Sequence, residues 1–259
     1  GQLTRMTLAG CRLVAAQSAE DAGRLQQLGA PAAACTVTGS IKFDVGIAAS
    51  VTEHGQALRR VIGVQRPVLV AASTHAGEEE RLLACLRRLQ QAMPALLLIL
   101  VPRHPDRADG IATLLEREGF HWARRSDTPA TLEGVEVYLG DTMGELIALY
   151  AAADVAFVGG SLVDTGGHNL LEPAALGLPV VSGPSLFNFR EIARRLADCG
   201  ALTVVEDAAA LADTLAPLLA DAGLRAQAGD AGRAFVAANR GATGRVMERL
   251  LPLLPAVSE

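Results

Sequence analysis

Short apolar runs alternate with amphipathic segments along most of this chain of 259 residues. Such runs, when turn-forming residues bound them, are typical of buried strands. We therefore expect strands at 12–17, 34–38, 67–72, 95–101, 135–139, 155–158, 179–182 and 201–205. Apolar residues spaced three and four apart predict helices at 19–29, 51–61, 78–93, 107–119, 143–152, 170–176 and 189–199, and onward to about 254. The polar stretch 120–129 is expected to be irregular.

The regular order of strand and helix predicts the fold class. Without hairpin turns of the Asn-Gly type, this order is typical of α/β proteins with a Rossmann-like, doubly wound parallel sheet. We interpret 39–50 as a linker, 1–38 as the strand–helix edge of a preceding domain and 51–259 as a complete Rossmann-like domain. Because 1–10 has the pattern of the end of a helix, we expect the chain to be a portion of a longer protein.

Composition narrows the class of function. Half of the residues are apolar, mostly Ala, Leu and Val, which favours helices packed on buried parallel strands. The net charge of −5 gives no overall basic field, so nucleic acid is not an expected partner. The four cysteines are far apart and form no CxxC pair, so neither a zinc site nor a disulfide framework is predicted. No apolar run reaches the ~18 residues that a membrane-spanning helix needs.

Polar residues at the predicted strand ends are the first candidates for a site. Ligands of open parallel sheets bind outside the carboxyl ends of the strands. Five segments at such positions are polar or rich in glycine, namely 73–75, 102–105, 140–145, 159–172 and 183–188. Polar loops follow many buried strands, so position alone does not decide their role.

The segment 159–184, GGSLVDTGGHNLLEPAALGLPVVSGP, has the densest pattern. Gly159 and Gly160 allow a sharp turn and a close approach of the backbone to a ligand. Pro173 suits the first turn of a helix whose free N–H groups favour a phosphate. Glu172, at the start of that helix, can accept hydrogen bonds from two ribose hydroxyls. The structural alternative is a glycine-rich turn with a capping carboxylate, and the density of Gly, Asn, Glu and Pro favours the ligand site.

Two other strand ends hold candidate donors. Arg103 can form paired hydrogen bonds with phosphate or carboxylate, or it can be an ordinary surface arginine. His104 and His75 are candidate donors to a ligand, with hydrogen bonding inside their own loops as the alternative. Ser73 and Thr74 lie beside His75, and at least one of them is expected to cap the next helix.

The segment 140–145, GDTMGE, has two interpretations. Asp141 or Thr142 is a natural N-cap for the following helix, which is a sufficient structural reason for the pattern. Met143 and Gly144 can instead offer a flat surface and free N–H groups to a base. The residues of this segment alone favour the N-cap.

Missing motifs exclude several reaction classes. The chain has no GxxxxGK[ST], which argues against P-loop phosphoryl transfer. It has no GxSxG and no GxGxxG at its first strand–helix turn, which disfavours an α/β-hydrolase and NAD chemistry. No DxD pair stands where a metal would bridge a diphosphate, so no cofactor or metal is expected.

Several of these segments occur together in one known family. FVGGSLVDTGGHNLLEPAALGLPVVSGPSLFNFREIA resembles the C-terminal half of bacterial 3-deoxy-D-manno-octulosonic acid (Kdo) transferases, which are inverting enzymes of the glycosyltransferase B fold. AQSAEDAGRLQQLGA, TVTGSIKFD, AASTHAGEEE, LVPRHPDRAD, GDTMGELIALYAAADVAFVGGS and FVAANRGATGR resemble the same family in the same order. The resemblance covers nearly the whole chain, and GGHNxLEPAAxGxPV is its most specific part.

The resemblance implies a binding site for the nucleotide-sugar donor CMP-Kdo in 51–259. The residues it assigns to the CMP part are Pro102, Arg103, Met143, Gly144, Glu145, Asn169, Leu170, Leu171 and Glu172. Further candidates at the same strand ends are Ser73, Thr74, His75, His104, Ser161 and His168. This assignment reverses the preference for a purely structural role at Met143 and Gly144.

The resemblance also implies what this chain lacks. In the family, an N-terminal domain carries the acceptor site, the catalytic carboxylate and the surface that associates with the membrane. Only the last strand–helix part of that domain, 1–38, is expected here, so no catalytic base is nominated. The implied partners are the CMP-Kdo donor, a lipid A precursor as acceptor and the inner-membrane surface, and the implied location is the cytoplasmic face of that membrane.

Two alternatives remain open from the residues alone. A transferase or epimerase of the same fold could use a UDP-sugar. The chain could also be a non-catalytic nucleotide-binding module that acts on a partner.

Overall fold

The computed structural model describes residues 1–254 and divides into two compact units. The larger unit is Ile47–Phe235, and the smaller one joins Gly1–Gly46 to the described residues from Val236 onward. The strands are β1 (Val14–Ala16), β2 (Cys35–Val37), β3 (Val68–Thr74), β4 (Leu97–Pro102), β5 (Trp122–Arg124), β6 (Val137–Leu139), β7 (Val155–Val158), β8 (Val180–Ser182) and β9 (Leu202–Val204).

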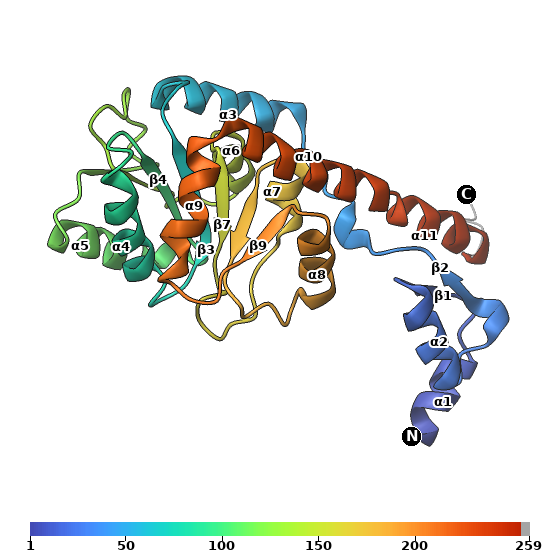
Figure 1. The fold of residues 1–259 in the computed structure, drawn as a ribbon. Coiled ribbons are helices and arrows are strands. Elements are labelled where there is room, and N and C mark those ends of the chain that lie inside the picture. Colours follow the sequence, from blue (N-terminus) through green and yellow to red (C-terminus); the bar gives the residue numbers. More distant parts are fainter. Residues whose placement is uncertain (255–259) are drawn as a thin grey trace. The chain divides into compact units, whose positions relative to one another are not determined.

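The helices follow the strands in regular alternation (Figure 1). They are α1 (Gln2–Ala9), α2 (Ala19–Gln27), α3 (Ala49–Ile62), α4 (Glu79–Gln90), α5 (Ala108–Arg117), α6 (Leu146–Ala151), α7 (Leu171–Leu176), α8 (Arg190–Asp198), α9 (Ala210–Ala220), α10 (Ala222–Asn239) and α11 (Ala242–Leu250). None of the helices in residues 1–254 is both long and apolar enough to span a bilayer.

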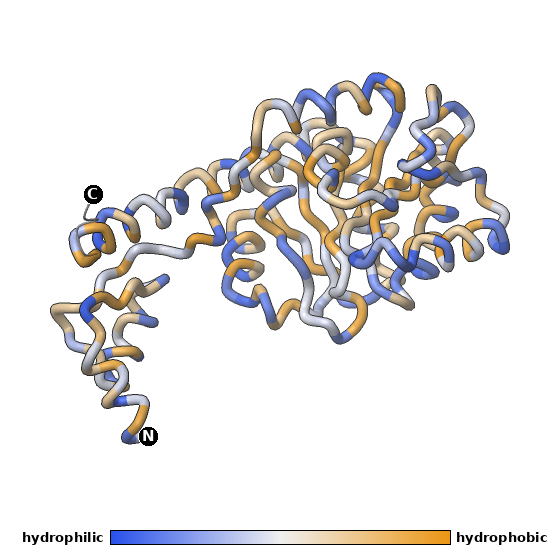
Figure 2. Tube along the Cα trace, turned by 180° about the vertical axis from the view of Figure 1, so that it is seen from behind, coloured by the Kyte–Doolittle hydropathy of each residue, from blue (hydrophilic) through white to orange (hydrophobic). Residues whose placement is uncertain are grey.

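Seven parallel strands form the sheet of the larger unit, in the order β5-β6-β4-β3-β7-β8-β9. Helices α4, α5 and α9 pack on one face, against strand residues such as Leu69 and Leu98. Helices α3 and α6 cover the other face, against residues such as Val70 and Ile99. Both faces of the strands are therefore buried, and Figure 2 shows the hydrophobic colouring that runs along them. This arrangement confirms the predicted doubly wound α/β fold.

The strand β5 was not expected, because 120–129 has no apolar run. Its residues Trp122, Ala123 and Arg124 are only partly buried, and β5 pairs with β6 alone at the edge of the sheet. An edge strand with one covered side does not require the apolar composition of a central strand.

The order of the strands reverses its direction between β3 and β7. After β3 the chain moves to β4 on one side, and after β7 it moves to β8 on the other side, although β3 and β7 are hydrogen-bonded neighbours. Loops that leave two neighbouring strands in opposite directions open a crevice at their carboxyl ends, which is the usual ligand position in open α/β sheets. The topology therefore directs attention to the residues that follow Thr74 and Val158.

The smaller unit contains a parallel β1–β2 pair, α1, α2 and α11. The range 236–259 was expected to belong to the Rossmann-like domain, whereas the structure joins the described part of that range to Gly1–Gly46. The joining contacts come from Asp44, which accepts hydrogen bonds from the N–H groups of Gly241 and Thr243, both at 2.6 Å. Arg245 also donates to the carbonyl of Thr38 at 2.8 Å.

Asp44 leads to a prediction about acid stability. Hydrogen bonds from Thr243, and from the backbone of Gly241, lower the pKa of Asp44 from 3.8 to about 2. Since the folded-state pKa lies below the unfolded value, this stabilisation is complete above about pH 4 and is lost as the pH falls through about 2. We expect amide protection at Gly241 and Thr243 to decrease over that range, and to be low at all pH values in Asp44→Ala.

Hydrogen exchange measured by NMR, corrected for intrinsic rates, tests this expectation. Glu248→Ala, an exposed change on α11, is the matched control and should behave as the wild type. A carboxyl group of Asp44 that titrates near 3.8 would contradict the prediction.

Candidate functional site

The predicted strand-end segments lie on the same side of the sheet in the larger unit, at the carboxyl ends of β3, β4, β6 and β7. The pairing of β3 with β4 shifts register between Ala72 and Thr74, which is a β-bulge. Ser73, inside the bulge, has a φ of 57°, a value that few residues other than glycine adopt. Bulges and backbone strain of this kind commonly occur where a side chain is redirected toward a site. Here the chain that leaves the bulge carries His75.

A buried carboxylate organises the turn after β7. Glu78 is fully buried, and its Oε2 accepts hydrogen bonds from the N–H groups of His75 at 2.9 Å and Gly160 at 2.7 Å. Its Oε1 accepts from the N–H groups of Ser161 at 3.0 Å and Leu162 at 2.9 Å. Amide groups arranged in this way usually bind an anionic ligand, and here the protein supplies the anion itself. The predicted close approach of this turn to a ligand is therefore replaced by an internal contact.

Glycine is required in this turn for steric reasons. A side chain at Gly159 would come within 2.9 Å of Glu78 and of the backbone of β3. Gly160 has a φ of 66°, and a side chain there would meet the ring of His168 at 2.8 Å. Ser161 is fully buried, and its hydroxyl donates to the carbonyl of Val158 at 2.8 Å. Ser161, a candidate binding residue, therefore has a structural contact of its own.

Three histidines and Arg103 gather beside this turn. The Nε2 atoms of His75 and His168 are 2.8 Å apart, and the two rings are nearly parallel, with centroids 5.0 Å apart. The ring of His104 meets that of His75 edge-on at 6.0 Å. Burial, His75 and Arg103 lower the pKa of His168 to about 4. These four residues come from the ends of β3 and β4 and from the loop before α7, so the fold brings together candidates that the sequence offered separately.

Thr74, another candidate, takes part in a buried ion pair. Its hydroxyl donates to Oε1 of Glu79 at 2.9 Å, and Glu79 in turn pairs with Arg107 at 2.6 Å. The N-cap of α4 is Glu78, without a side-chain cap, so the expectation that Ser73 or Thr74 caps this helix is wrong. Thr74 instead anchors the end of β3 to the segment that follows β4.

The start of α7 carries Glu172, the residue expected to bind the ribose hydroxyls. Asn169 donates from its amide to Glu172 at 3.0 Å and accepts the N–H of Leu171 at 3.0 Å. Burial raises the pKa of Glu172, although the hydrogen bond from Asn169 opposes that shift. Leu170 and Leu171 are fully buried, so neither side chain is presented to a ligand.

The 140–145 segment is held by hydrogen bonds with Arg125 and Ser126. Glu145 accepts from Arg125 at 2.8 Å and from the hydroxyl of Thr142. Burial alone would raise the pKa of Glu145, and the hydrogen bonds from Thr142 and Arg125 bring it below its usual value. Asp141 accepts from the backbone and the hydroxyl of Ser126, at 2.9 and 2.6 Å. The N-cap of α6 is Glu145, so neither Asp141 nor Thr142 is the cap that the sequence suggested.

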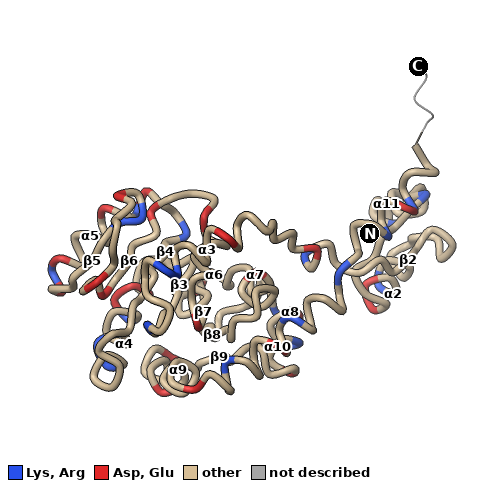
Figure 3. The backbone as a smooth tube through the Cα atoms, turned by 90° about the horizontal axis from the view of Figure 1, so that it is seen from above, with Lys and Arg blue, Asp and Glu red and all other residues tan. Residues whose placement is uncertain are grey.

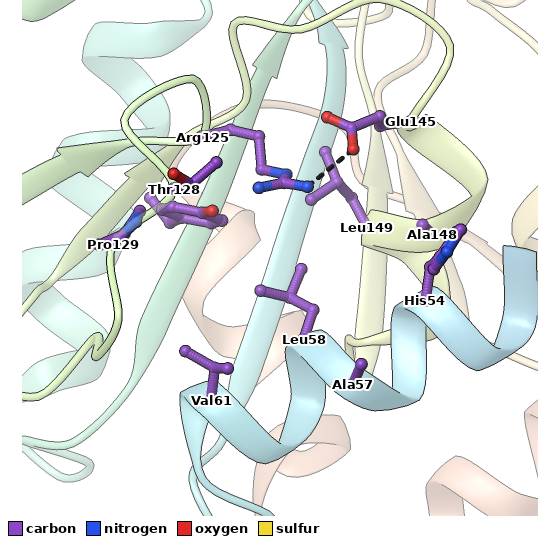
Figure 4. Close-up of a pocket in the computed structure, with 11 residues that line it drawn as sticks. His54, Ala57, Leu58, Val61, Arg125, Thr128, Pro129, Glu145, Ala148 and Leu149 are labelled. Carbon is purple, nitrogen blue, oxygen red and sulfur yellow. Dashed lines mark hydrogen bonds and ion pairs between the residues drawn. The ribbon is translucent and has the colours of Figure 1, made fainter.

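These contacts leave the tip of the segment free. Met143 is 76% exposed, and Gly144 has a φ of 79°. The side chain of Met143 and the main chain at Gly144 are therefore presented outward. Glu145 lines a hollow of about 360 Å³ (Figure 4).

That hollow lies between α3, α6 and the 125–129 segment. Figure 4 shows the guanidinium of Arg125 directed at Glu145 across its rim, with Leu58 of α3 on the other side. The Arg125–Glu145 pair thus ties the 125–129 segment to the start of α6. Sequence reasoning missed Arg125, because it lies in the stretch expected to be irregular.

Charges in the larger unit are mixed, with Lys and Arg positions interspersed among Asp and Glu positions (Figure 3). Arg103 is exposed, and its side chain enters none of the ion pairs recorded within residues 1–254. Across the same residues, no three His, Cys, Asp or Glu side chains are grouped so as to hold a metal ion. The arrangement is suited to an anionic, hydroxyl-bearing ligand, since it offers a guanidinium at Arg103, imidazole groups at His75 and His168, and an acceptor at Glu172.

Two family models match the chain. The family described as "Glycosyl transferases group 1" matches residues 123–235. The family described as "3-Deoxy-D-manno-octulosonic-acid transferase (kdotransferase)" matches residues 1–45. The first match lies in the larger unit and the second in the smaller one.

Curated relatives are similar to this chain over both units. The 3-deoxy-D-manno-octulosonic acid transferase of Haemophilus influenzae is 43% identical over 243 residues, which are 93% of this chain and 57% of that relative. The transferase of Bordetella pertussis is 43% identical over 254 residues, which are 96% of this chain and 58% of that relative. The chain therefore spans somewhat more than half the length of these relatives.

A solved structure is similar to most of the chain. The C-terminal CMP-Kdo binding domain of WaaA from Acinetobacter baumannii is 36% identical, with a TM-score of 0.64, and the alignment covers 71% of this chain and 98% of that domain. This likeness, together with the group 1 match, assigns the glycosyltransferase B fold. On these similarities, the chain belongs to the Kdo transferase family.

Proposed function

We propose that the larger unit binds CMP-Kdo and is the donor-binding part of an enzyme that transfers Kdo. The observation that carries this proposal is the cluster of His75, His168 and Arg103 at the switch point between β3 and β7, with Glu172 at the start of the helix that follows His168. CMP-Kdo carries a phosphate, a carboxylate and ribose hydroxyls. A guanidinium and imidazole donors, together with a carboxylate acceptor, suit those groups.

The proposed contacts divide among three segments. Arg103, just beyond Pro102 at the end of β4, holds the phosphate or the sugar carboxylate. Met143 and Gly144 meet the nucleotide at the exposed tip of their segment, and the Arg125–Glu145 pair fixes that tip from behind. Glu172 accepts from the ribose hydroxyls, with Asn169 orienting its carboxylate.

The activity of the whole protein is part of this proposal. We infer that it transfers Kdo from CMP-Kdo to a lipid A precursor in lipopolysaccharide core synthesis, at the cytoplasmic face of the inner membrane. The support for this step is the family membership alone. We assign no catalytic base to residues of this chain and assign acceptor binding and membrane association to the N-terminal domain found in the family.

Calorimetric titration with CMP and UMP tests the donor site. We expect CMP to bind more tightly than UMP, and Arg103→Ala and Glu172→Ala each to weaken CMP binding about tenfold or more, since each removes hydrogen bonds to or from a charged group. Arg117→Ala is the matched control, because Arg117 is exposed on α5 and pairs only with the neighbouring Glu118 among the ion pairs of residues 1–254.

Two outcomes would contradict the proposal. Tight UMP binding with indifference to CMP would instead indicate a transferase or epimerase that uses a UDP-sugar. Normal CMP binding in both Arg103→Ala and Glu172→Ala would show that the site lies elsewhere.

A further inference from the structure

The contact between His75 and His168 restricts how the two rings can be protonated. Their Nε2 atoms are 2.8 Å apart, so one Nε2 must carry a hydrogen and the other must accept it. The neutral pair satisfies this condition. The pair with one additional proton also satisfies it, because the added proton can sit on the outer nitrogen of the ring that donates. A second additional proton would place two N–H groups against each other and break the contact. The pair is therefore able to gain one proton.

The surroundings disfavour a positive charge on His168 in the absence of a ligand. The charged and titratable groups that influence His168 are His75 from the end of β3, Arg103 and His104 from the end of β4, and Glu78 from the start of α4. Burial, His75 and Arg103 hold the pKa of His168 at about 4. Glu78 acts in the opposite direction, but its carboxylate is already bonded to four backbone N–H groups.

An anion bound beside Arg103 would reverse this balance. It would offset the positive charge of Arg103, which opposes protonation of His168, and would add a negative charge that favours protonation. Both histidines are partly exposed, so a ligand in the crevice can reach them. Because the two rings are coupled, the added proton belongs to the pair rather than to either ring.

We propose that the His75–His168 pair is a subsite for an anionic oxygen of the donor and takes up one proton when that oxygen binds. This inference rests on the proposed function and goes beyond it. It assigns to two histidines a charge that appears only with the ligand, so that the site is not strongly cationic when empty. The anionic oxygen can belong to the phosphate of the nucleotide or to the carboxylate of the sugar acid.

Titration calorimetry in buffers of different ionisation enthalpy measures this proton directly. At about pH 7.5 the phosphate of CMP is already a dianion, so its own ionisation contributes little. We expect the observed enthalpy to vary linearly with the buffer enthalpy, with a slope of about one proton taken up per ligand. Uptake with CMP but not with cytidine assigns the phosphate. Uptake only when Kdo is added to the CMP-saturated protein assigns the carboxylate.

Variants show whether the two rings take up the proton or only have a structural role. His168→Gln and His75→Gln are expected to abolish the uptake and to weaken binding of the responsible ligand about 10- to 100-fold, because a charge-assisted hydrogen bond is lost. His121→Gln, an exposed histidine beside β5, is the matched control and should retain both.

The outcomes distinguish this inference from the function on which it rests. If CMP binds the wild-type protein without proton uptake, and Kdo added afterwards causes none, the inference is overturned and the proposed donor site stands. Full uptake in both glutamine variants also overturns it. If CMP does not bind the wild-type protein at all, the proposed function is overturned, and this inference with it.

Discussion

Glu78→Ala is expected to lower the free energy of unfolding of the larger unit by about 4 kcal/mol or more. The substitution removes the acceptor for four backbone N–H groups, those of His75, Gly160, Ser161 and Leu162. Glu78 is fully buried, and each buried donor left unpaired costs about 1–3 kcal/mol. Domains are stable by only about 5–15 kcal/mol, so the variant is expected to lie close to the limit of folding.

Chemical denaturation followed by the fluorescence of Trp122 measures this change, since the single tryptophan lies in the larger unit. Glu78→Gln keeps the side-chain volume but turns one acceptor oxygen into a donor, so we expect an intermediate loss. Glu80→Ala, an exposed neighbour on the same helix, should change stability by no more than about 0.5 kcal/mol. A loss in Glu78→Ala as small as that of Glu80→Ala would contradict the prediction.

Glu78 also separates the role of the glycine-rich turn after β7 from the role of the neighbouring side chains of His168 and Arg103. The N–H groups of Gly160, Ser161 and Leu162 are bonded to the carboxylate of Glu78, so they are not available to a ligand. The side chains of His168 and Arg103 have no such internal carboxylate bonded to them among residues 1–254. The glycine-rich turn thus has a structural role, and in the proposed donor site the histidines and Arg103 are the groups that would meet the donor's negative charge.

The central strands could be predicted from the sequence because they are buried on both faces. Val68–Thr74 and Leu97–Pro102 are continuous apolar runs apart from their ends, and a parallel sheet covered by helices requires that composition. The burial of these strands predicts the site only as a set of strand ends. The strand Trp122–Arg124, at the sheet edge, could not be predicted in this way, because a partly exposed strand can be polar.

The contacts that organise the site join residues too far apart in the chain to be predicted from local pattern. Glu78 reaches the turn at Gly160 across 82 positions, and His75 meets His168 across 93. Each residue alone has a sufficient local explanation, such as a helix start or a polar loop. Only the adjacency of β3 and β7, which the chain order does not specify, brings them together. For the same reason the pattern of the last helix did not reveal that Asp44 binds its first turn.

Arg107→Ala is the second substitution for which we expect a large effect, a loss of about 3–5 kcal/mol in the free energy of unfolding. Arg107 pairs with both oxygens of Glu79, at 2.6 and 3.2 Å, and donates to the carbonyl of Thr74 at 3.3 Å. The side chain of Glu79 is only 2% exposed. Without Arg107, its negative charge would be buried with only the hydroxyl of Thr74 as a recorded side-chain donor.

A second change identifies the cause of that loss. Adding Glu79→Gln to Arg107→Ala removes the buried charge while keeping an acceptor for Thr74, so the double variant is expected to be more stable than Arg107→Ala alone. Arg117→Ala breaks an exposed pair with Glu118 on the same helix and should cost no more than about 1 kcal/mol. Denaturation followed at Trp122 compares all three. If the double variant is as unstable as Arg107→Ala, the loss comes from missing packing at the end of β3 rather than from the buried carboxylate of Glu79.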